Sequence, residues 1–187
     1  QVLIAIMILC SIPRTSATQV EQLTIEDLGD LAETVVRGTV VSERSFWNDS
    51  RTKIFTEIVV AAEETYKGQP ASTVRVLQLG GEVDGVRVTV HGALAWTPGD
   101  EVLLFLEPYR GGRHVVTGLS QGRFDVVRDE ATGEIFVSRG GGPRATAGGT
   151  GVASTPGASV PRTPLSSVLE RALGDRPARA RDDSGRR

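Results

Sequence analysis

The sequence predicts a mainly β domain: a small, curled antiparallel barrel with one short N-terminal helix and a disordered C-terminal tail. Short runs of alternating apolar and polar residues, separated by turn residues, extend from Thr34 to Ser138, as is typical of half-buried strands. After this region the chain consists largely of Gly, Ala, Thr, Ser and Pro, a composition that buries too little apolar surface to fold. The length of 187 residues allows one domain with appendages.

An export signal is expected at the N-terminus. Residues Val2–Leu9 are all apolar, and Thr15-Ser-Ala17 follows as a small-residue cleavage site, which predicts a signal peptide over residues 1–17. One alternative is a buried core helix. The other is a lipoprotein processed at Cys10, but Leu9 is larger than the residue that such processing usually requires. The chain opens on a residue other than Met, so the start is expected to be truncated. A secreted, periplasmic or cell-surface protein without a stable membrane anchor after cleavage is the prediction.

Cleavage after Ala17 would leave a mature chain without cysteine, because Cys10 is the one cysteine in the sequence. Disulfides and thiolate metal sites are then excluded, and stability comes from packing. All but two of the 21 basic residues are arginines, which suggests a bacterial source with a GC-rich genome. Glycosylation at the sequon Asn48-Asp-Ser50 is therefore not expected.

A short helix should begin after Thr24. Thr24 is a favourable N-cap, Asp27 lies three residues later, and Leu23 and Leu28 occupy the positions of a hydrophobic staple. Gly29 lowers helix propensity, so the expected length is two to three turns.

The first strand, predicted over residues 33–43, organises the domain. Val36 and Val40 lie on one face, and Arg37 and Thr39 lie on the other. Gly38 in the middle weakens a flat strand, but it would allow a bend or the close approach of another backbone in a barrel. A tolerated glycine in a flat strand is the alternative.

Further strands are predicted over residues 53–66, 73–79, 86–90, 102–106, 114–117, 123–127 and 134–138. The segment Val102–Leu106 is apolar at every position, as expected for a strand covered on both faces. Trp96-Thr-Pro-Gly-Asp100 predicts a type II turn before it. The last two strands should form a hairpin closed by Asp129–Gly133.

The domain is predicted to span residues 18–138. Residues 139–187 form the low-complexity tail, interrupted by a helical patch at 165–173. This tail carries a net charge of +5 and the remainder carries −7. Such asymmetry is compatible with self-association or attraction to an acidic surface, and also with a merely solvated end.

Several motifs resemble a known superfamily. The segments Val35–Val40, Tyr66-Lys-Gly68 and Pro98–Leu106 look like an OB-fold of the netrin and tissue-inhibitor-of-metalloproteinases type. Together with Gln78–Glu82 and Gly118–Phe124, they resemble an uncharacterised family of secreted bacterial proteins over residues 20–138. The resemblance implies an OB-like barrel and an association with secreted zinc proteases. Inhibition through an N-terminal cysteine is not implied, because the mature chain has none.

No residue set commits the chain to a chemistry. His91 and His114 are the two histidines, too few for the usual zinc triad. A Ser120, His114 and Asp125 triad has no support from spacing. Glu82 and Asp84 lie between glycines and could ligate calcium, but a hairpin turn is the favoured interpretation. The acidic body and the 5% aromatic content argue against nucleic acid.

We therefore expect an exported, non-enzymatic protein-binding module, with no catalytic, cofactor or metal residues assigned. Its partner would be a protein, and an extracellular protease or a cell-envelope component are the candidates. The alternative is a small calcium-dependent binder or hydrolase centred on the loop of Glu82 and Asp84 and on His114.

Overall fold

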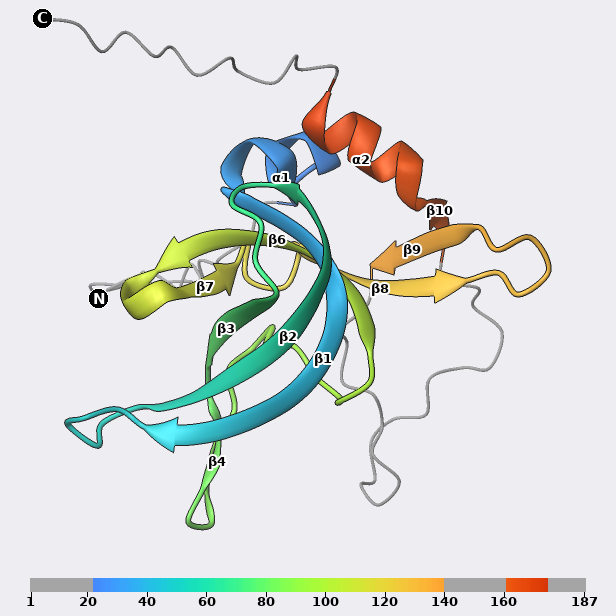
Figure 1. Ribbon diagram of the computed structural model, residues 1–187. Coiled ribbons are helices and arrows are strands. Elements are labelled where there is room, and N and C mark those ends of the chain that lie inside the picture. The colour runs from blue at the N-terminus through green and yellow to red at the C-terminus, as the bar shows by residue number, and fades with distance from the viewer. Residues whose placement is uncertain (1–21, 140–160, 175–187) are drawn as a thin grey trace, which may run out of the picture.

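The computed structural model describes residues 22–139 and 161–174 (Figure 1). These form a mainly β domain, as the sequence predicts. Its elements are α1 Ile25–Leu31, β1 Thr34–Trp47, β2 Ile54–Lys67, β3 Thr73–Leu79, β4 Gly81–Val83, β5 Val86–Val88, β6 Glu101–Tyr109, η1 Arg110–Gly112, β7 Arg113–Val116, β8 Arg123–Arg128, β9 Ile135–Arg139, β10 Thr163–Pro164 and α2 Leu165–Leu173. The predicted signal peptide over residues 1–17 lies outside the described residues.

Five strands close into a ring in the order β1, β2, β3, β7, β6 and back to β1. The first half of β1 makes this possible, because residues 34–39 pair with β6 on one side while β1 pairs with β2 on the other. The small barrel predicted from the sequence is therefore present. One seam differs from an all-antiparallel arrangement: β3 and β7 run parallel and pair at Val76 and His114.

The curl of β1 comes from irregular pairing with β2. The register shifts at three places along this ladder, and the last shift leaves Val41 as an extra residue on β1. A bulge of this kind bends its strand and increases the local twist. Both strands continue past the barrel as a long hairpin arm (Figure 1).

Two separate apolar cores lie on the two faces of β6. Its even-numbered residues point into the barrel, and Leu103 and Phe105 point outward. All five residues from Val102 to Leu106 are buried, which confirms that this strand is covered on both faces. The barrel core comprises Val36, Val40, Ile58, Val60, Val74, Val76, Leu94, Trp96, Val102, Leu104, Leu106 and Val116.

The outer core lies beneath α1 and α2. It contains Ile25 and Leu28 from α1, Leu165, Val168 and Ala172 from α2, and Ala32, Val35, Leu103, Phe105, Phe124 and Val137 from the strands and their connections. In Figure 1 the two helices lie side by side at one end of the sheet, with β8 and β9 alongside.

Helix α1 has the capping box that the sequence predicts. Thr24 Oγ1 accepts from the Asp27 backbone N–H at 3.1 Å, and Asp27 Oδ2 accepts from the Thr24 backbone N–H at 2.9 Å. These bonds satisfy backbone donors that a helix N-terminus otherwise leaves unpaired. At seven residues, α1 has the two-turn length expected from the position of Gly29.

The predicted helical patch at 165–173 is the helix α2, but its place differs from the expectation. The sequence places it in a tail beyond a domain that ends at residue 138. In the structure β10 pairs with β9, α2 packs into the outer core, and Arg171 forms an ion pair with Glu26 at 2.9 Å. The folded domain therefore has a second helix and includes residues 161–174. Residues 140–160 and 175–187 of the predicted tail are outside the described residues.

Within residues 22–139 and 161–174, none of the helices is long and apolar enough to span a membrane.

Candidate functional site

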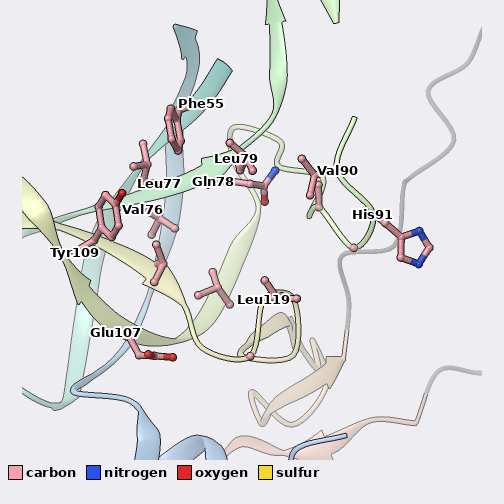
Figure 2. A pocket seen from close by; sticks show the side chains of 15 residues that line it. Phe55, Val76, Leu77, Gln78, Leu79, Val90, His91, Glu107, Tyr109 and Leu119 are labelled. Atoms are coloured by element: carbon pink, nitrogen blue, oxygen red, sulfur yellow. The ribbon is translucent and has the colours of Figure 1, made fainter. Parts of the chain in front are cut away.

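An apolar groove of about 490 Å³ lies along the seam between β3 and β7. Figure 2 shows its strand residues, including Leu77, Leu79 and Tyr109, together with Leu119 from the loop after β7. The lining comprises Phe55, Val76, Leu77, Gln78, Leu79, Val90, His91, Gly92, Ala93, Glu107, Tyr109, Val115, Val116, Gly118 and Leu119. A volume of this size suits a small ligand or a short stretch of peptide.

The groove exists because β3 and β7 diverge on leaving their bridge at Val76 and His114. Gly80 N–H donates to a β2 carbonyl at 2.9 Å, which fixes the alternation along β3. In an antiparallel ladder alternate residues bond to the same neighbour. Leu77 and Leu79 therefore direct their backbone groups away from β2: Leu77 lies beside the bridge with β7, and Leu79 beyond it faces the groove.

The opposite wall has the same property. Thr117 N–H donates to the Phe105 carbonyl at 2.9 Å, so by alternation Val116 directs its backbone groups toward the groove. Within the described residues, Leu79 and Val116 have no strand partner on this side. Two strand edges thus face one apolar slot, where water or a ligand must satisfy them.

Gln78 holds one rim of the groove in place. Its Oε1 accepts from Leu94 N–H at 3.0 Å and from Trp96 Nε1 at 3.2 Å, and its Nε2 donates to the Leu94 carbonyl at 3.0 Å. Both backbone groups of Leu94 are satisfied by one side chain. The connection from Val90 to Trp96 is therefore fixed to β3, which makes this rim a preformed wall.

Leu119 has two unfavourable properties at once. Its side chain is 66% exposed, and its backbone lies in the left-handed region at φ 66°. That region costs a residue with a Cβ about 1–2 kcal/mol, and exposure forgoes the free energy of burying a leucine. Strain retained at an exposed apolar residue is a feature of binding sites, and Leu119 borders the groove.

Glu107 is the one acidic residue in the lining. Its side chain is half-buried on the outer face of β6, and no ion pair or hydrogen bond to it is present among residues 22–139 and 161–174. His91, the other titratable residue at the groove apart from Tyr109, is exposed and points away from the apolar side chains in Figure 2.

The loop of Glu82 and Asp84 is a β-hairpin, as favoured from the sequence. Glu82 on β4 forms an ion pair with Arg87 on β5 at 2.5 Å, and the turn residues Asp84 and Gly85 have φ of 53° and 77°. Two positive φ values define the type I′ turn that closes short hairpins. His114 lies elsewhere, in β7 at the barrel seam.

The described part of the chain brings together no three metal-ligating side chains. The triad of Ser120, His114 and Asp125 has no support here either, because Asp125 Oδ1 accepts a hydrogen bond from the buried Arg123 at 2.9 Å. Nδ1 of His114 is buried without a hydrogen-bond partner in the described residues. The calcium-dependent or hydrolytic alternative stays a prediction, which calorimetric titration with calcium and zinc would test.

Two arginine networks brace the barrel away from the groove. Arg123 is 2% exposed, donates to the Ala95 carbonyl and lies 4.5 Å from the centre of the Trp96 ring. Arg37 pairs with Glu63 and Glu101. Burial lowers the pKa of Arg37, but hydrogen bonds with Tyr66 and Glu101 outweigh it and raise this pKa above its ordinary value. Both networks hold parts of the barrel together, and their role is structural.

Sequence reasoning did not identify Glu107, Leu79 or Leu119 as site residues. Glu107 and Leu79 follow ordinary strand patterns. The positive φ of Leu119 is not predictable from the sequence, because leucine rarely adopts that conformation. The groove depends on the divergence of two strands that are far apart in the chain, which alternation of residues does not encode. This chain matches no protein-family model and no curated protein.

Proposed function

We propose that this protein is a non-enzymatic binding module that takes an apolar segment of a partner protein into the groove between β3 and β7. The observation that carries the proposal is Leu119, an exposed and conformationally strained leucine at the rim of an apolar groove. Exposed apolar groups on a rigid scaffold favour association with another apolar surface. Leu79 at 41% and Tyr109 at 44% exposure extend the same surface.

The proposal also places the module outside the cytoplasm, with a secreted protease or a cell-envelope protein as the candidate partner. The apolar run Val2–Leu9 and the small residues up to Ala17 support export. N-terminal sequencing of the secreted protein should give a start near Thr18. An extracellular product that retains residues 1–17 would contradict the export proposal.

The groove is tested with the full chain as bait and a single charge as the probe. Leu119→Asp introduces a carboxylate at the rim, and Val41→Asp is the matched control because Val41 is also exposed, at 54%, but lies outside the groove on the β1 bulge. Proteins retained by the parent chain from its own secreted proteome should be retained by Val41→Asp and lost on Leu119→Asp.

Equal retention on both variants would show that the groove is not the binding site. Retention of no protein by the parent chain would contradict the binding module itself. A urea denaturation curve of each variant confirms that loss of binding does not reflect unfolding.

A further inference from the structure

We propose that the segment bound in this groove is an extended strand, which hydrogen-bonds to the free edge of β3 and places a basic side chain opposite Glu107. The inference rests on the proposed function, and it specifies the chemistry of the partner segment. An apolar helix and an uncharged strand are the outcomes that its test excludes.

The backbone groups of the groove favour a strand over a helix. Leu79 directs its N–H and C=O into the groove, and Val116 does so from the other wall. A helix satisfies its own backbone and leaves such edges unpaired, whereas an extended peptide presents donors and acceptors along its length. Adding a strand to an open edge is a recurring mode of peptide recognition.

Side-chain alternation then sets the pattern of the bound segment. In an extended peptide every second side chain points to the same face. Phe55 is the partner of Leu79 in the ladder of β2 and β3, and Leu77 lies on the same face as Leu79, two residues before it. Every second residue of the bound strand should therefore be apolar.

Charge complementarity predicts that the bound strand carries a basic residue. Glu107 is half-buried in an apolar lining and has no cation beside it within the described residues. A carboxylate in such surroundings gains from a charge-assisted hydrogen bond to Lys or Arg. The wider field has the same sign, since residues 1–138 carry a net charge of −7, which attracts basic segments.

The test selects nine-residue peptides from a random phage-displayed library on the full chain, and then measures the affinity of the best synthetic peptide. Selected sequences should alternate apolar residues and contain one Lys or Arg. Replacing that basic residue by norleucine should weaken binding about tenfold to the parent chain and little to Glu107→Gln. Glu134→Gln is the matched control, because it removes the same charge at the exposed end of the β8–β9 turn.

A scan of backbone N-methylation along the same peptide tests the strand. Methyl groups on alternate residues should abolish binding, and those between them should not, except at the one position that faces Val116, because an added strand directs every second N–H to β3. Loss at every position would indicate a helix and overturn the inference. An equal effect of norleucine on the parent chain and on Glu107→Gln would overturn the ion pair.

The failure of the inference is separable from that of the proposed function. Suppose that Leu119→Asp abolishes binding of the peptide, that Glu107→Gln does not change it, and that methylation shows no alternating pattern. The groove would then remain the binding site, and the strand would be contradicted. Selected peptides that bind equally to Leu119→Asp, or a library that yields no binder, would contradict both.

Discussion

Gly38 lies against Ala61 so closely that a Cβ at Gly38 would stand 2.2 Å from the Ala61 carbonyl oxygen. Gly38 is also flanked by β6 through its register with Val102. Its φ is not positive, so the requirement is for space rather than for a special backbone conformation. The close approach expected for a barrel strand is confirmed, and the alternative of a tolerated glycine in a flat strand is wrong.

Gly38→Val should therefore destabilise the domain. The added side chain meets a backbone atom that cannot rotate away, so we expect a loss of about 3 kcal/mol, at the upper end of overpacking effects. Denaturant unfolding should show a lower midpoint at an unchanged slope. Ser42→Val is the control, because it adds the same side chain to an exposed position of β1. A midpoint that rises in Gly38→Val would contradict the close approach.

Gly29→Ala should release α2. A Cβ at Gly29 would lie 1.8 Å from the Ala172 carbonyl oxygen, although alanine by itself favours helix by about 1 kcal/mol. We expect the steric effect to dominate, so that amide hydrogens of α2 exchange faster. Leu31→Ala on the same helix is the control, since Leu31 is 52% exposed. Unchanged exchange in α2 would show that the helices adjust to the methyl group.

Leu119→Asn should stabilise the protein. Asparagine tolerates the left-handed region better than leucine, and the change removes an exposed apolar side chain, so we expect a gain of about 0.5–1 kcal/mol. Leu79→Asn is the comparison: it also borders the groove but lies in a strand, where asparagine is unfavourable. Opposite shifts of the two urea midpoints are expected. A destabilised Leu119→Asn would mean that the residue is retained for packing rather than for binding.

Acid should weaken the β8–β9 hairpin through Asp129. Hydrogen bonds from the backbone N–H groups of Thr132 and Ala131 hold the pKa of this carboxyl below its ordinary value of 3.8. A lowered pKa in the folded state adds stability above pH 3.8, and this contribution is lost as the pH falls through the lowered pKa.

The measurement compares Asp129→Ala with the parent chain at pH 6 and at pH 2.5. Asp129→Ala should have a lower urea midpoint at pH 6, and the difference should shrink at pH 2.5. Glu130→Ala, at the exposed neighbouring position, should show no such change between the two pH values. A difference that grows on acidification would reverse the assigned sign.

Much of the barrel follows from local patterns. The β3 bounds Thr73–Leu79 and the α2 bounds Leu165–Leu173 are those predicted. Alternation and helical periodicity are local properties, and one sequence suffices to read them. The turn at Thr97–Asp100 is also as predicted, because Asp100 N–H donates to the Thr97 carbonyl at 3.0 Å and Gly99 has φ 94°.

The placement of α2 could not be read in the same way. Gly29 suggested a weak helix, whereas its role is to admit the backbone of Ala172, more than a hundred residues later in the chain. The low-complexity stretch at residues 140–161 made residues 165–173 look isolated from the domain. The site residues Glu107 and Leu119 escaped for a related reason, since a groove is formed by pairing between distant strands and has no local signal.

Truncation tests whether residues 161–174 belong to the folded domain. A chain ending at Arg139 lacks Leu165, Val168 and Ala172, which are buried in the outer core together with Leu28. A buried leucine or valine side chain contributes about 1.5–3 kcal/mol, so we expect a loss of several kcal/mol and increased binding of an apolar fluorescent dye. A chain ending at Gly174 should keep the urea midpoint of the full protein. Equal midpoints for the two truncated chains would show that the first core suffices and that α2 adds no stability.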